Sequence, residues 1–186
     1  AWEEAFAEAG HRFDRQTLHD QIGKGADNYV PGLLPGVSEE EAERLGDAHG
    51  RIYKDKYLRQ AKPFPKARDL LLRCKDAGYR VVLASSASGS ELEHYRKLLN
   101  AEDIVDAHTS ADDVRSSKPC PDIFDTARLK IGVLPEEALV IGDTPYDIEA
   151  AAKAGMKAIA VRSGKFPDET LADALAIYDD VASILE

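Results

Sequence analysis

The sequence has few cysteines, which could cross-link the chain, and no long hydrophobic run, which could anchor it in a membrane. It has two cysteines among 186 residues, Cys74 and Cys120, with no CxxC spacing and no histidine cluster. Neither a disulfide framework nor a zinc site is therefore expected. No apolar run approaches the roughly 18 residues that a membrane span needs. The first residues are acidic and helical in pattern, where a signal peptide would be basic. We expect a cytoplasmic protein with no membrane partner.

Basic residues are outnumbered by acidic ones, and glycine and proline are present only at ordinary levels. Lysine and arginine number 24 against 34 aspartates and glutamates, a net charge of −10, so nucleic acid is not an expected partner. The 13 glycines and 9 prolines are too few for a low-complexity or collagen-like chain. With 44% hydrophobic residues the chain can bury a core. Its length fits one domain, or one core domain with a small insertion. The oligomeric state stays open between a monomer and a weak homodimer.

The chain changes character part way along. Residues 1–62 show helical spacing and no strand pattern. Within them, Ser38 followed by Glu41 predicts a capping box at the start of a helix. The prolines of residues 62–65 then interrupt helix formation, because each lacks an amide donor and restricts the residue before it. We expect a small all-helical domain over 1–62 and a second domain over 63–186.

Strand and helix patterns alternate in the second domain. Expected strands are 79–84, 105–109, 138–141, 157–161 and 176–178, and expected helices are 67–77, 91–99, 121–131, 146–154 and 169–175. This alternation predicts an α/β fold, with a Rossmann-like parallel sheet and helices on both of its faces. In such sheets the groups that act on ligands gather at the carboxyl ends of the strands.

Hydroxyl groups follow the first expected strand. Ser85, Ser86 and Ser88 form a turn that leads into a helix, where hydroxyls and free amides favour an oxyanion. Ser88 is the best candidate for a helix N-cap. Ser85, directly at the strand end, is the better candidate for a functional role.

Two carboxylates follow the strand 138–141. Asp143 lies at the strand end, and Asp147 comes four residues later at the start of a helix. Two neighbouring carboxylates repel each other unless a cation lies between them, and hard oxygen ligands suit Mg²⁺. Lys118, before Pro119, lies in a loop that leads into a helix, and Lys24 lies between two glycines; either lysine alone would be read as solvated surface.

Taken in order, these segments resemble one family. LASSAS, SKPCPDIF and VIGDTPYDIEAAAKAGM, which begin at Leu83, Ser117 and Val140, are similar to the second, third and fourth motifs of haloacid dehalogenase-like hydrolases. The resemblance covers essentially the whole chain and is strongest to phosphatase members such as phosphoglycolate phosphatases. It implies that residues 1–62 are an all-helical cap domain and that the rest is the Rossmann-like core.

The resemblance also implies a mechanism. A small phosphorylated metabolite would be hydrolysed through an aspartyl-phosphate, with Mg²⁺ as cofactor. Ser85 and the Ser86 amide would bind a phosphoryl oxygen, and Lys118 would offset negative charge. Asp143 would bind Mg²⁺ directly and Asp147 more indirectly through water. Lys24 would contact the substrate from the cap.

The family's first motif, DxDGT, which carries the nucleophilic aspartate, does not occur in the sequence. We expect about twenty further residues upstream of Ala1, which would carry this strand and its turn, and we expect the fragment alone to be inactive. In the family this strand is central. Without it, the strands that end at Ser85 and Ile141 would have unpaired inner edges.

Two other readings stay open. A sugar phosphate mutase of the β-phosphoglucomutase type shares similar segments but usually has Glu-Asp where this chain has Gly142-Asp143, so Gly142 favours hydrolysis. The acid pair of Asp143 and Asp147 counts against a dehalogenase, which would not need it. A phosphonatase would need a lysine that forms a Schiff base with its substrate. A non-catalytic module that binds phosphate or metal is the alternative outside the enzymes.

Overall fold

The computed structural model describes residues 1–186, and the chain divides between Lys62 and Pro63 into two units. We call Ala1–Lys62 the N-terminal unit and Pro63–Glu186 the C-terminal unit. None of the helices combines the length and the apolar character that a membrane crossing requires.

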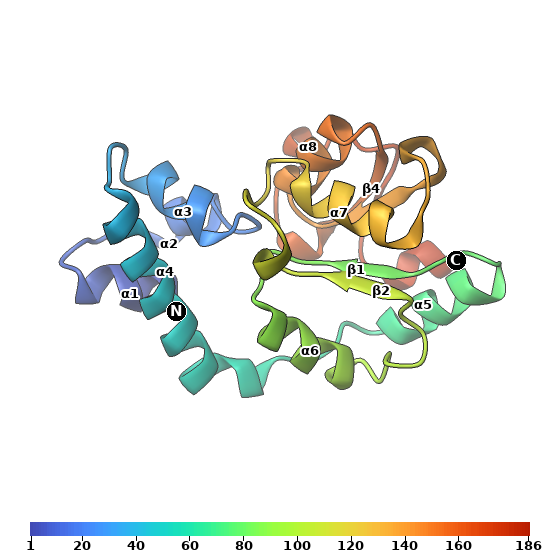
Figure 1. Cartoon of the computed structure of the whole chain (residues 1–186), viewed down its shortest axis with the longest axis horizontal. Helices are drawn as coiled ribbons and strands as arrows, with labels where there is room; N and C mark the ends of the chain where they lie inside the picture. Colours follow the sequence, from blue (N-terminus) through green and yellow to red (C-terminus); the bar gives the residue numbers. More distant parts are fainter. The chain divides into compact units, whose positions relative to one another are not determined.

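The N-terminal unit is built from helices, shown in blue to teal in Figure 1. They are α1 (Trp2–Glu8), α2 (Arg15–His19), α3 (Ala26–Leu33), α4 (Glu39–Ile52), a π-helical turn (Tyr53–Tyr57) and a 3-10 turn (Leu58–Gln60). Its only β contact is an isolated bridge between Ile22 and Lys24. The expectation that this part of the chain holds no strand is confirmed.

Only one of the two hydrogen bonds of the expected capping box forms at the start of α4. The Ser38 hydroxyl accepts a hydrogen bond from the Glu41 amide at 3.2 Å. The Glu41 carboxylate does not complete the box but binds the Arg44 guanidinium, at 2.6 and 2.9 Å. For the Glu41 carboxylate, the Arg44 guanidinium, which is charged and offers two donors, takes the place of the neutral Ser38 amide.

Aromatic side chains fill the core of the N-terminal unit. Phe6 is buried and meets Phe13 edge to face, with ring centroids 5.0 Å apart. Tyr29 is fully buried, and its hydroxyl donates to the Leu18 carbonyl at 2.7 Å. This hydrogen bond removes the cost of burying the phenol.

The C-terminal unit alternates helices and strands. Its elements are α5 (Ala67–Asp76), β1 (Val82–Ala84), α6 (Gly89–Leu98), β2 (Ala107–Thr109), α7 (Asp122–Ile131), β3 (Leu139–Gly142), α8 (Pro145–Lys153), β4 (Lys157–Val161) and β5 (Ile177–Tyr178), with short 3-10 turns between them. All strand pairs are parallel. Figure 1 shows α6 and α7 on opposite sides of β1 and β2. The predicted α/β, Rossmann-like class is confirmed.

One expected helix is wrong. Residues 169–175 contain a 3-10 turn, Asp168–Thr170, and no α-helix. The Leu175 amide already donates to the Ala158 carbonyl at 2.8 Å, as in strand pairing. Residues needed for pairing with β4 are therefore not available to a helix.

The strands form two separate sheets. β1 pairs with β2 alone, and β3 pairs with β4, which pairs with β5. One edge of β1 and one edge of β3 have no strand partner. Leu139 and Ile141, on β3, are 52% and 40% exposed, unlike apolar residues in a central parallel strand.

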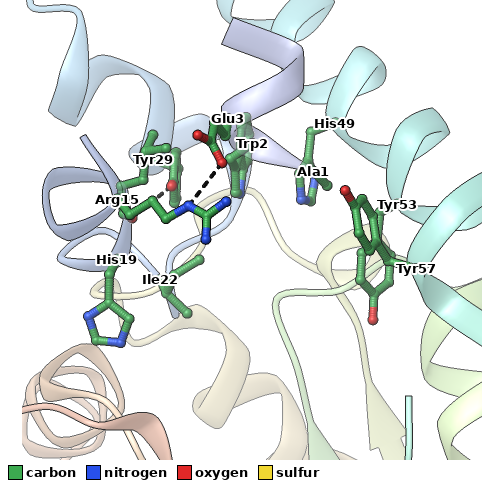
Figure 2. Close-up of a pocket in the computed structure, with 11 residues that line it drawn as sticks. Ala1, Trp2, Glu3, Arg15, His19, Ile22, Tyr29, His49, Tyr53 and Tyr57 are labelled. Carbon is green, nitrogen blue, oxygen red and sulfur yellow. Dashed lines mark hydrogen bonds and ion pairs between the residues drawn. The ribbon is translucent and has the colours of Figure 1, made fainter. Parts of the chain in front are cut away.

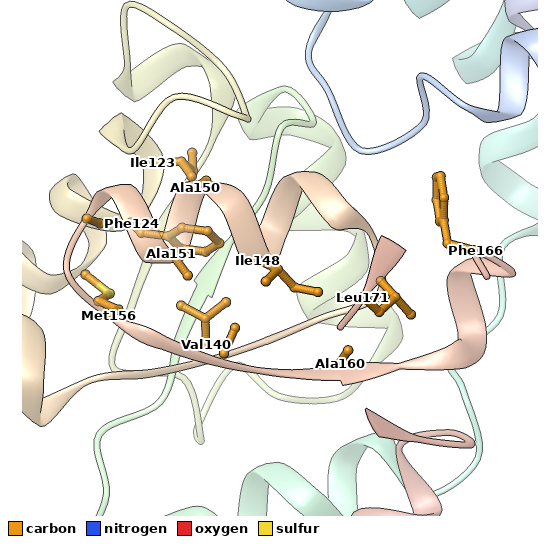
Figure 3. Close-up of a cluster of buried hydrophobic side chains, with 12 residues drawn as sticks. Ile123, Phe124, Val140, Ile148, Ala150, Ala151, Met156, Ala160, Phe166 and Leu171 are labelled. Atoms are coloured by element: carbon orange, nitrogen blue, oxygen red, sulfur yellow. The ribbon is translucent and has the colours of Figure 1, made fainter. Parts of the chain in front are cut away.

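Apolar side chains of α8, β3 and β4 form the core of the C-terminal unit (Figure 3). Ile148 and Ala151 of α8 lie against Val140 of β3 and Ala160 of β4, all of them buried. The small alanines allow the helix to approach the sheet closely. This packing fixes the direction of the residues that follow β3.

We expect Phe6→Ala to lower the free energy of unfolding by about 3–5 kcal/mol, because it leaves a cavity among the rings of the N-terminal unit. Phe64→Ala makes the same change at a side chain that is 53% exposed and should change it by less than about 0.5 kcal/mol. Urea unfolding followed by circular dichroism measures both. Equal losses would contradict this account of the core.

Candidate active site

The carboxyl end of β3 leads directly into α8. Thr144 is the N-cap of this helix, and its hydroxyl accepts from the Asp147 amide at 3.3 Å. Asp143 lies between the last strand residue, Gly142, and this cap. The strand and the cap thus hold Asp143 at the strand end, where the sequence analysis expected it.

A buried ion pair joins the loop before α7 to the start of α8. Lys118 Nζ lies 2.7 Å from Asp147 Oδ1, and the two side chains are 9% and 8% exposed. The other Asp147 oxygen, Oδ2, accepts from the Thr144 hydroxyl at 2.7 Å and from the Thr144 and Asp143 amides at 3.1 and 3.3 Å. The ammonium group also lies 5.9 Å from the centre of the Phe124 ring. Both oxygens of Asp147 are therefore engaged within the protein.

Burial raises the pKa of Asp143, and the negative charge of Asp147 raises it further, while Lys118 acts in the opposite direction. A buried carboxylate beside a second one is stabilised by a cation. The Asp143 carboxylate therefore fits one ligand position of a hard metal ion such as Mg²⁺. The chain contains no group of three or more metal-ligating side chains. Mg²⁺ held there by Asp143 would complete its coordination with water and other oxygen ligands.

Two glycines allow this close packing. A Cβ atom on Gly142 would overlap the Asp147 side chain, with Cγ at 2.6 Å. A Cβ atom on Gly164, after β4, would overlap the Asp143 carbonyl oxygen. Gly142 is part of a motif that the sequence shows. Gly164 was not predicted, because a close approach between distant segments leaves no local pattern.

Ser85 and Ser86 lie at the carboxyl end of β1, in the other sheet. The Ser85 amide donates to the Thr109 carbonyl at 2.9 Å, and its hydroxyl oxygen accepts from the Ala87 amide at 3.1 Å. This bond leaves the hydroxyl hydrogen available for donation. Ser88 is the N-cap of α6, with its amide bonded to Glu91 at 2.9 Å, as expected.

Lys24 lies in the N-terminal unit, where its ammonium group donates to Gln21 Oε1 at 2.6 Å. The structure thus brings Lys118, Asp143 and Asp147 together. The functional roles expected for these three residues and for Ser85, Ser86 and Lys24 stay predictions.

The N-terminal unit contains a pocket of about 540 Å³ that the sequence analysis did not foresee (Figure 2). Trp2 at its wall is stacked between Tyr29 and His49, with ring centroids 4.1 and 4.0 Å away. At the rim, Arg15 pairs with Glu3 at 3.2 Å. The stacked rings come from three helices, so helical spacing within any one segment could not reveal them.

We expect Asp147→Asn to lower the free energy of unfolding by up to about 3–5 kcal/mol, because it removes the charge that pairs directly with buried Lys118 and leaves only the Asp143 carboxylate nearby. Glu149→Gln is the matched control on the same helix. Its ion pair with Lys153, at 2.8 Å, is about half exposed and is worth about 0.5 kcal/mol or less. Chemical denaturation measures both changes, and a small loss in Asp147→Asn would contradict the buried pair.

His49 should make the N-terminal unit sensitive to acid. Burial lowers its pKa from 6.5 to about 4. As the pH falls through this window the unfolded chain takes up the proton first. The folded state therefore keeps its full stability above pH 6.5. As the pH falls towards 4, the free energy of unfolding decreases by on the order of 3 kcal/mol in all.

Urea midpoints measured between pH 4 and 7 by the fluorescence of Trp2, the single tryptophan, test this expectation. His49→Phe keeps a stacked ring but cannot titrate, so its midpoint should vary less over the same window. Identical pH profiles for the two proteins would show that His49 is not the group responsible.

The chain has clear relatives of known family. The family model "haloacid dehalogenase-like hydrolase" matches residues 3–161. The chain is 38% identical over 191 residues to the chloroplastic protein Suppressor of Quenching 1 of Arabidopsis thaliana, covering 97% of this chain and 18% of that protein. It is 28% identical over 156 residues to glyceraldehyde 3-phosphate phosphatase of Methanopyrus kandleri, covering 82% of this chain and 66% of that enzyme. The chain thus spans less than two thirds of the length of either relative.

A solved structure agrees over the full chain. The crystal structure of a hydrolase from Pseudomonas syringae superposes with a TM-score of 0.91 at 28% identity, covering 100% of this chain and 87% of that one. Together with the family match, this similarity includes the segments that carry Lys118, Asp143 and Asp147. The chain belongs to the haloacid dehalogenase-like hydrolase family.

Proposed function

We propose that this chain is part of a Mg²⁺-dependent phosphomonoester hydrolase that works through an aspartyl-phosphate. The observation that carries the proposal is the cluster of Lys118, Asp143 and Asp147 at one strand end. A fixed ammonium group beside a carboxylate suited to a divalent cation complements a phosphoryl group, whose oxygens carry the charge that must be stabilised. The phosphatase name of one relative supports the same reaction class.

Each residue has a distinct role in this proposal. Lys118, oriented by Asp147, offsets negative charge on the phosphoryl oxygens and on the attacking carboxylate. Asp143 would hold the metal directly, while Asp147, whose oxygens are already hydrogen-bonded, would act through water and through Lys118. Bound Mg²⁺ would reduce the repulsion between the carboxylate and the phosphate dianion. Ser85 and the Ser86 amide donate to a phosphoryl oxygen.

The nucleophilic aspartate belongs, in this proposal, to a strand that lies outside the chain. The unpartnered edges of β1 and β3 support this view, because backbone groups on a central strand need hydrogen-bond partners. A parallel strand between them would pair with both. Its carboxyl end would lie beside the strand ends that carry Ser85 and Asp143.

The substrate in this proposal is a small phosphorylated metabolite of the phosphoglycolate or triose phosphate kind. The N-terminal unit acts as the cap that selects the leaving group, with Lys24 as one contact. The aromatic pocket beside Trp2 supports selection by this unit, since such pockets bind small molecules. A cytoplasmic location and a monomeric or weakly dimeric state complete the proposal.

The test is release of inorganic phosphate from a panel of phosphomonoesters, with and without Mg²⁺, by the protein that includes its natural upstream residues. We expect Asp143→Ala to lower kcat at least about a hundredfold, since it removes a direct metal ligand. Asp173→Ala, at an exposed aspartate, should leave kcat unchanged.

No phosphate release by a demonstrably folded protein would overturn hydrolysis. Conversion of β-glucose 1-phosphate to glucose 6-phosphate would then identify a mutase. Metal or phosphate binding with no turnover of any substrate would identify a binding module.

A further inference from the structure

The turn that follows β4 lies directly against Asp143. A Cβ atom placed on Gly164 would overlap the Asp143 carbonyl oxygen and would lie 2.9 Å from its carbonyl carbon and 3.2 Å from its Cγ. Separations below about 3 Å for a Cβ require one of the two groups to move. Gly164 therefore occupies the space next to both the backbone and the carboxyl group of Asp143.

This turn is anchored on both sides of Gly164. Before it, the Arg162 guanidinium binds both oxygens of Asp168, at 2.9 and 2.8 Å, and also binds Asp179. After it, Phe166 is buried in the core and meets Tyr146 edge to face, with ring centroids 6.5 Å apart. A two-bond arginine fork is geometrically specific, and a buried ring resists displacement. The buried Phe166 ring, more than the exposed ion pairs of Arg162, resists displacement of the turn by a larger residue at position 164.

Asp143 is thus held from two directions. On one side its amide donates to Asp147 Oδ2 at 3.3 Å. On the other side its carbonyl contacts Gly164. The peptide groups on either side of the Asp143 Cα fix where the Cα–Cβ bond points, and hence where the carboxylate lies.

We propose that Gly164 is a positioning residue for the reaction: the anchored turn of residues 162–166 sets the direction of the Asp143 carboxylate, and a side chain at position 164 misdirects it. This inference rests on the proposed function, in which Asp143 is a metal ligand. Gly164 does not touch the substrate and takes no chemical part. Its contribution is the absence of a side chain.

The test uses Gly164→Ala in the protein with its upstream residues. A displacement of about 1 Å at a catalytic group can cost about a hundredfold in rate. We therefore expect kcat to fall between about tenfold and a hundredfold and the dissociation constant for Mg²⁺, from calorimetric titration, to rise at least about fivefold. KM should change by less than about twofold, because Ser85, Ser86 and Lys118 are untouched.

The matched control is Gly50→Ala, which adds the same methyl group where nothing lies within 4 Å and should leave kcat, KM and Mg²⁺ affinity unchanged. Arg162→Lys is the second variant, for the case that Gly164→Ala does not fold. It keeps the charge but loses the two-bond fork to Asp168, so it should lower kcat and Mg²⁺ affinity in the same direction by a smaller factor. Circular dichroism establishes folding for each variant.

An active wild type with a folded Gly164→Ala variant that keeps kcat and Mg²⁺ affinity within twofold would overturn the inference and leave the proposed function standing. A fall in kcat with unchanged Mg²⁺ affinity and a large rise in KM would also overturn it, since the variant would then act on substrate binding. A wild type that binds Mg²⁺ but shows no turnover still allows the affinity measurement to decide. A wild type with neither property would overturn both proposals.

Discussion

The ion pair between Lys118 and Asp147 constrains the rest of the site. Two opposite charges can be removed from water in this unit because each has the other as partner and because Asp147 has three further donors. The pair joins the loop before α7 to the start of α8. It also places the Asp147 side chain so close to residue 142 that only glycine fits there. Asp143 is the residue left at the strand end with its carboxylate uncommitted to this network.

This arrangement bears on the choice between hydrolase and mutase. Family members of the mutase type usually have glutamate at the position of Gly142. In this chain even a Cβ atom there would overlap Asp147, so a larger residue would require a different path for the Asp147 side chain. The glycine is therefore linked to the geometry of the Lys118 pair and is more than a small departure in the motif.

Much of the C-terminal unit could be predicted from the sequence, because the alternation of short strand patterns with helical patterns is a local signal. Asp143 and Asp147 stood out because they follow a recognisable strand and begin a helix, whereas Lys118 was singled out only by the resemblance to the family. Long-range effects were not accessible. The pairing of residues 175–176 with β4 replaced an expected helix, and the contact between Gly164 and Asp143 joins segments about twenty residues apart.

The N-terminal unit shows the same limit. Helical spacing correctly predicted a unit without strands and a helix that begins at Ser38. Which aromatic rings would meet was not predictable, since Trp2, Tyr29 and His49 come from three helices whose mutual angles depend on packing. The Glu41 carboxylate binds the Arg44 side chain and not the Ser38 backbone amide, a preference that the capping-box pattern does not predict.

The two open strand edges have a consequence for handling the protein. Unpaired backbone groups on β1 and β3, next to the exposed Leu139 and Ile141, are a template to which a strand from any other chain can add. The 186-residue chain in isolation should therefore be prone to aggregate at high concentration, by pairing of these edges between molecules. The colloidal stability of the isolated chain therefore depends on whether another strand pairs with these two edges.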